Sequence, residues 1–104
     1  MNQNQQNQQQ GQPQQQQLQI KVRDEELKGA YSNLMQILHT KEEFVLDFFF
    51  NAPPQGILAS RVMVSPGHAK RIAAALAENV KKYEEKFGKI EQGEAPEGKI
   101  GFIK

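Results

Sequence analysis

The stretch Arg61–Gly88, RVMVSPGHAKRIAAALAENVKKYEEKFG, decides the fold of this 104-residue chain. Its first residues alternate as in a strand, and apolar residues then recur at helical spacing. Ser65 is a preferred N-cap, and Pro66 fits the first helical position, where no backbone N–H is needed. Gly88 suits the C-terminal cap. The stretch therefore predicts a strand that leads directly into one long helix.

The predicted helix is amphipathic. At about 100° per residue, one narrow stripe of its surface is apolar and the opposite side is charged. The stripe consists of Ala69, Ile72, Ala73, Leu76, Val80, Tyr83 and Phe87. Because an apolar stripe must be covered by another element, we expect the helix to pack on one face of a sheet built by earlier residues.

The start of the helix carries three basic side chains, His68, Lys70 and Arg71. The helix dipole favours anions at that end, so cations there are unfavourable unless something offsets them. Three interpretations remain open: a carboxylate such as Asp47 or Glu43 pairs with them, an anion binds there, or the side chains are simply solvated. The candidate anion-binding or partner-binding residues are Ser65, His68, Lys70 and Arg71.

The residues before the helix have the patterns of strands. Residues 30–40 and 43–50 carry apolar side chains on both faces and flank a polar turn, which is typical of a β-hairpin. Residues 58–64 form a further strand, residues 18–22 a short edge strand, and the proline pair within 51–56 a loop. We expect an α+β domain with an antiparallel sheet of about four strands, followed by the helix packed on one face.

A single helix covers only one face of such a sheet, so the other face is expected to stay apolar and open. Exposed apolar patches of this kind mark interaction surfaces. We therefore expect a homo-oligomer, with a dimer favoured, and an unidentified protein partner. The interface candidates on the uncovered face are Val45, Phe49, Leu34 and Leu38.

Asp47 interrupts an apolar strand. A buried carboxylate must be paired or have a raised pKa. An ion pair with Arg61, Lys70 or Arg71 is one interpretation, and a proton-transfer group is the other. Asp47 and Arg61 are the candidates for a buried ion pair.

Composition divides the chain into three parts. Residues 1–17 hold eleven Gln and three Asn and predict a disordered, low-complexity tail. Residues 18–90 form a single α+β domain, and residues 91–104 a flexible segment that ends in a stretch able to form a short strand. The net charge of +1 gives no general attraction to nucleic acid or an anionic membrane. Without a membrane span or a secretory signal, a cytoplasmic location is expected.

No catalytic motif occurs, and two His without any Cys are too few for a zinc site. We therefore expect no catalytic residues, no metal and no cofactor. The chain is interpreted as a non-enzymatic, oligomeric protein-binding or assembly module. The alternative is a single-stranded nucleic-acid-binding protein that uses the sheet and the basic helix start.

Several short motifs stand out: Tyr31-Ser32-Asn33, Glu43-Phe44, Asp47-Phe48, Pro53, Arg61-Val62, Ser65-Pro66-x-His68-Ala69-Lys70-Arg71, Asn79, Tyr83-Glu84 and Phe87-Gly88. Together they resemble the domain of unknown function 3467 family, a small bacterial family. The resemblance spans residues 31–88, and the motif at 65–71 is its most specific part. It implies a bacterial, single-domain protein, and it carries over no catalytic, cofactor or substrate residues.

Overall fold

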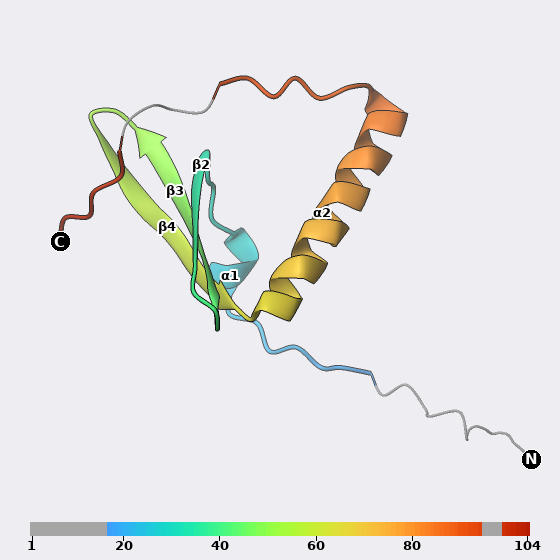
Figure 1. Ribbon diagram of the computed structural model, residues 1–104, viewed down its shortest axis with the longest axis horizontal. Helices are drawn as coiled ribbons and strands as arrows, with labels where there is room; N and C mark the ends of the chain where they lie inside the picture. Colours follow the sequence, from blue (N-terminus) through green and yellow to red (C-terminus); the bar gives the residue numbers. More distant parts are fainter. Residues whose placement is uncertain (1–16, 95–98) are drawn as a thin grey trace, which may run out of the picture.

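The computed structural model describes residues 17–94 and 99–104. Along this part of the chain the elements are α1 (Asp24–Lys28), β2 (Leu34–His39), β3 (Phe44–Ala52), β4 (Gln55–Val64) and α2 (Pro66–Phe87) (Figure 1). The strands form an antiparallel sheet in the order β2-β3-β4. The predicted α+β class, with an antiparallel sheet followed by a long helix, is confirmed.

The sheet of the described residues has three strands, fewer than the four or so that were expected. Residues 18–22 form no strand, and the apolar side chains of Leu18 and Ile20 are exposed. Alternation alone does not make a strand, because a strand also needs a neighbour that completes its backbone hydrogen bonds. Residues 99–104 likewise form no strand. The predicted tail lies outside the described residues except at position 17.

The β3–β4 connection is tighter than the loop expected at residues 51–56. β3 runs to Ala52 and β4 begins at Gln55, so only Pro53 and Pro54 remain in the turn. Proline has no N–H to donate, and the corner of a hairpin is a position where none is needed. The prolines therefore shorten the connection without interrupting either strand.

Local signals place both ends of α2 where they were predicted. The Ser65 hydroxyl accepts a hydrogen bond from the backbone N–H of His68 at 3.2 Å, which satisfies one orphan donor of the first turn. At the other end Gly88 takes a φ of +101°, a conformation that residues with a side chain rarely adopt. Its N–H donates to the Glu84 carbonyl at 2.9 Å.

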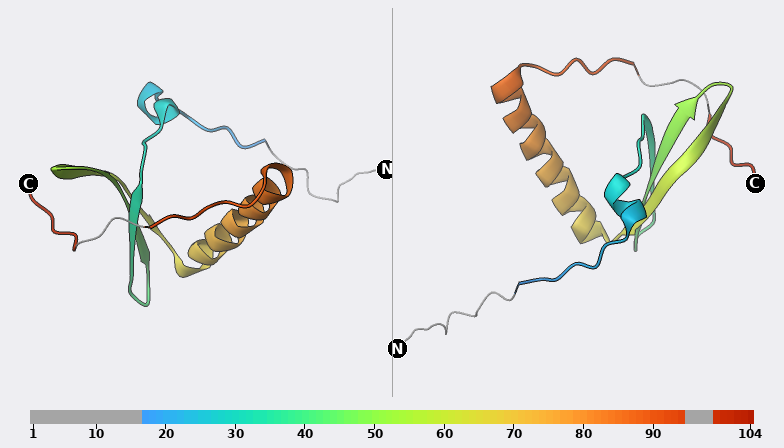
Figure 2. Two further views of the ribbon diagram at one scale, coloured as in Figure 1. Left: turned by 90° about the horizontal axis from the view of Figure 1, so that it is seen from above. Right: turned by 180° about the vertical axis from the view of Figure 1, so that it is seen from behind.

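α2 stands away from the sheet, and the expectation that it packs on one sheet face is wrong. None of its residues is buried, and Figures 1 and 2 show it diverging from the end of β4. Ser65 alone joins Val64 to Pro66, with an extended backbone at φ −70° and ψ 158°. A proline keeps the residue before it extended, so the chain has no loop with which to turn the helix back.

The buried core is small. In the described part of the chain, Leu46 and Phe49 are the buried apolar residues, each 7% exposed, and Asp47 is buried between them. All three lie on β3, the central strand. A chain this short buries only a modest fraction of its surface, so the stability of a single copy is marginal. The apolar side chains that would normally complete the core lie instead on exposed surfaces.

Candidate association surfaces

The sheet presents two different faces. Residues paired across an antiparallel ladder point to the same side, so the observed register sorts the side chains into two sets. One face is called the strapped face, because the C-terminal segment lies on that side; it carries Leu34, Leu38, Val45, Asp47, Phe49 and Arg61. The opposite face is called the open face; it carries Met35, Ile37, Phe44, Leu46, Phe48 and Val62. Figure 2 shows α2 and the C-terminal segment on opposite sides of the sheet.

An ion pair occupies the centre of the strapped face. Asp47 lies opposite Arg61 in the β3–β4 register. Arg61 Nε donates to Asp47 Oδ1 at 2.7 Å, and Nη2 donates to Oδ2 at 2.8 Å. This two-pronged geometry matches the planar guanidinium to the carboxylate. Of the three cations considered as partners, the structure therefore pairs Asp47 with the one on the neighbouring strand.

The environment keeps Asp47 ionised. The hydrogen bonds from Arg61 hold the pKa of Asp47 below its ordinary value, burial opposes them, and the positive charge of Arg61 lowers the pKa further. The same hydrogen bonds raise the pKa of Arg61 above its ordinary value. A general base needs a pKa near the working pH. The lowered pKa of Asp47 therefore suits a structural ion pair better than proton transfer.

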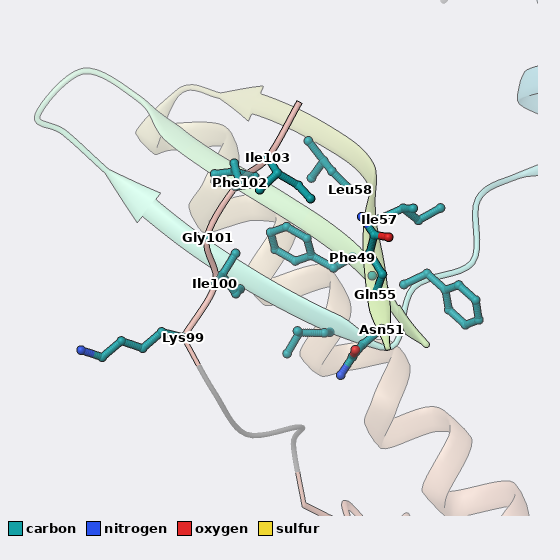
Figure 3. Close-up of a pocket in the computed structure, with 13 residues that line it drawn as sticks. Phe49, Asn51, Gln55, Ile57, Leu58, Lys99, Ile100, Gly101, Phe102 and Ile103 are labelled. Carbon is teal, nitrogen blue, oxygen red and sulfur yellow. The ribbon is translucent and has the colours of Figure 1, made fainter. Parts of the chain in front are cut away.

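The C-terminal segment, residues 99–104, crosses the strapped face (Figure 3). The Phe102 ring lies 6.0 Å from the Phe49 ring, measured between centroids. The guanidinium carbon of Arg61 lies 5.8 Å from the centroid of the Phe102 ring. A cavity of about 420 Å³ lies between the segment and the β3–β4 hairpin. A segment without regular structure thus packs on part of the face that was expected to be open.

The interface candidates named from sequence lie largely on covered positions. Phe49 is buried, Leu34 and Val45 are half-buried, and Leu38 is exposed. The sequence interpretation assumed that α2 would cover the opposite face. The segment that packs on this face was visible in the sequence only as a short apolar stretch near the C-terminus. That stretch was too brief to assign to a sheet face.

The open face also carries exposed apolar side chains. Met35 is 44% exposed and Ile37 is 51% exposed. None of its six residues carries a charged side chain, and depletion of charge is typical of the centre of protein–protein interfaces. Sequence reasoning assigned this face to packing within the chain, so it missed these residues as interface candidates.

The apolar stripe of α2 is uncovered as well. Leu76 is 63% exposed and Phe87 is 65% exposed. Tyr83 and Phe87, one turn apart, have ring centroids 5.0 Å apart. The helix therefore carries a continuous apolar stripe. Figure 2 places α2 on the side of the sheet opposite the C-terminal segment, which is the side of the open face.

The basic helix start is exposed and has no carboxylate partner among the described residues. Ion pairs there involve neither Lys70 nor Arg71, so neither Asp47 nor Glu43 offsets their charge. Arg71 Nη2 lies 3.2 Å from His68 Nδ1. Because a guanidinium only donates, His68 Nδ1 must accept in this contact. The candidates Ser65, His68, Lys70 and Arg71 thus gather on the first turns of α2 as a solvated cluster.

Two polar residues before β2 have roles that the sequence did not reveal. The Ser32 hydroxyl donates to the Phe49 carbonyl at 3.0 Å. Asn33 and Asn51 bond reciprocally: Asn33 Nδ2 donates to the Asn51 carbonyl at 3.1 Å, and the Asn51 N–H donates to Asn33 Oδ1 at 2.8 Å. These bonds fasten the chain to the end of β3. These bonds join residues far apart in sequence, so the sequence marked Ser32 and Asn33 only as members of the Tyr-Ser-Asn motif.

Within residues 17–94 and 99–104, no cluster of three or more His, Asp or Glu side chains is arranged to hold a metal ion. Neither helix in the described part of the chain has the length and apolar character needed to cross a bilayer.

The fold and its surfaces define a small α+β domain with an ionised pair on one sheet face and apolar surface on the other. The chain belongs to the family described as protein of unknown function (DUF3467), whose model matches residues 1–92. The match confirms the resemblance and extends it beyond residues 31–88, into the Gln/Asn-rich tail. Comparison with curated proteins and with solved structures gave no match.

Proposed function

We propose that this protein is a non-enzymatic, homo-oligomeric protein-binding or assembly module of the bacterial cytoplasm, with a dimer as the favoured form. One observation carries the proposal: the open face and the stripe of α2 are both apolar and both exposed on the same small domain. Monomeric proteins rarely leave contiguous apolar surface of this extent uncovered. Association is the direct way to cover it.

The energetics favour the same conclusion. Full burial of one Leu, Ile, Met or Phe side chain contributes about 1.5–3 kcal/mol. Leu46 and Phe49 alone are buried among the apolar residues that the structure describes, which is little for a domain to fold on by itself. Covering the open face and the stripe in an oligomer supplies the hydrophobic stabilisation that one copy lacks.

Single-stranded nucleic-acid binding is the weaker candidate. It would draw on the lysines and arginine of α2, but Lys82 lies 3.5 Å from Glu78 in an i,i+4 pair. The open face carries no Lys or Arg to contact phosphates. Binding to oligonucleotides that is strong at low salt and falls steeply with added salt would favour this alternative.

The proposal is tested by mass in solution. Sedimentation equilibrium and light scattering should give twice the mass of one chain, and Leu76→Glu should weaken the dimer at least about tenfold by placing a charge on the stripe. Ala74→Glu is the matched control, because it introduces the same charged side chain on the charged side of the same helix. A strict monomer at high concentration, or equal effects of the two variants, would overturn the proposal.

A further inference from the structure

The direction of α2 is set where it leaves the sheet. The single linking residue, Ser65, is extended and precedes a proline, and α2 begins immediately after it. Connections between a strand and a helix that packs back on the same sheet are commonly about 2–6 residues long. With a one-residue link, α2 lies on the side of the open face but diverges from the sheet instead of packing on it. Its stripe is thus kept from the surface that would best cover it.

These two surfaces match each other in chemistry. The stripe presents aliphatic and aromatic side chains, and the open face presents Met35, Ile37 and Val62 around the buried Leu46. A dimer built helix against helix would leave both open faces bare, and one built sheet against sheet would leave both stripes bare. Reciprocal packing of each helix on the other copy's open face covers all four surfaces at once.

The area is sufficient for such an arrangement. The open face and the stripe contribute seven large apolar side chains that are exposed. With their half-buried neighbours they present on the order of 700 Å² per copy, close to the roughly 800 Å² that each partner gives to a stable interface. A two-fold axis makes the two contacts identical, so the assembly closes at two copies.

We propose that the dimer forms by reciprocal exchange, in which α2 of each copy lies on the open face of the second copy. This inference rests on the proposed function and specifies its geometry. The occupant of the open face is then the stripe of a second copy of this chain, centred on Leu76. The surface that was expected to be covered within one chain is covered between two.

The absence of cysteine from the sequence permits a cross-linking test without background. Ile37→Cys places a thiol on the open face, and Leu76→Cys places one on the stripe. The two single variants are co-expressed, treated with a short bis-maleimide, digested, and the linked peptides identified by mass spectrometry. Because each chain carries one cysteine, a link between positions 37 and 76 joins two chains. Lys81→Cys, on the charged side of α2, replaces Leu76→Cys as the control.

Exchange predicts a product of doubled mass that links positions 37 and 76 and is lost when Lys81→Cys is used. Predominant 37–37 links would indicate sheet against sheet, and predominant 76–76 links helix against helix; either result overturns the exchange. In a further chain that carries both Ile37→Cys and Leu76→Cys, a link between positions 37 and 76 within a monomer also overturns it. A dimer by light scattering without 37–76 links overturns the exchange but leaves the proposed function standing. A monomer without links overturns both the exchange and the proposed function.

Discussion

Asp47 shows how much one polar side chain can organise. It is fully buried at the centre of the strapped face, and Arg61 satisfies both of its oxygens. The same Arg61 lies over the Phe102 ring, so the pair links the sheet to the C-terminal segment. A buried carboxylate is tolerated here because its partner is on the adjacent strand and reaches it with ideal geometry.

We expect Asp47→Asn to lower the melting temperature at neutral pH by several degrees, because Arg61 loses the carboxylate that it bonds to. The folded state lowers the pKa of Asp47, so the stabilisation is fully present above the unfolded value of about 3.9. It is lost as the pH falls through the lower folded value. Thermal melts from acid to neutral pH should therefore show the gap between variant and wild type closing at the acid end.

Glu42→Gln provides the control for this titration. Glu42 is exposed in the β2–β3 turn, so its neutralisation should leave the melting temperature nearly unchanged at every pH. A gap for Asp47→Asn that stays constant from acid to neutral pH would contradict the ion-pair account.

α2 and the C-terminal segment exchange the roles that their sequences suggest. The regular, strongly amphipathic helix has no buried residue, while an irregular segment packs on the sheet. The reason lies in how each is connected. α2 is held by a one-residue link, whereas the C-terminal segment follows eleven residues of chain after Phe87 and reaches the far face of the sheet.

Phe102→Ala should destabilise the domain by about 1 kcal/mol, since the ring contacts Phe49 and Arg61 but remains 57% exposed. Urea unfolding at fixed protein concentration measures the change. Ile103→Ala is the comparison, because Ile103 is 79% exposed and its truncation should change stability by less than about 0.5 kcal/mol. Equal losses for the two variants would show that the segment does not dock through Phe102.

The whole molecule has more apolar surface than one copy can hide. The C-terminal segment covers only part of one side of its sheet, and its helix projects away from the other side (Figure 1). In the proposed dimer a second copy shares this surface, and the stability of the chain then depends on mass action.

Consequently the melting temperature should rise with protein concentration. A hundredfold increase in concentration adds about 2.7 kcal/mol to the stability of a dimer that unfolds to separate chains, which is several degrees for a domain of this size. Calorimetry over that concentration range measures the shift. A melting temperature independent of concentration would indicate that a single copy is stable alone.

Sequence by itself determined α2, from its Ser65 cap to Gly88, because capping and helical periodicity act within a few residues of each other. It determined the two hairpin strands and the need of Asp47 for a partner in the same way. Tertiary structure alone decided that the partner is Arg61, because strand register depends on which residues pair across β3 and β4. It also decided that the C-terminal segment and not α2 packs on the sheet, because a helix's direction depends on the geometry of its link and not on the pattern of its side chains.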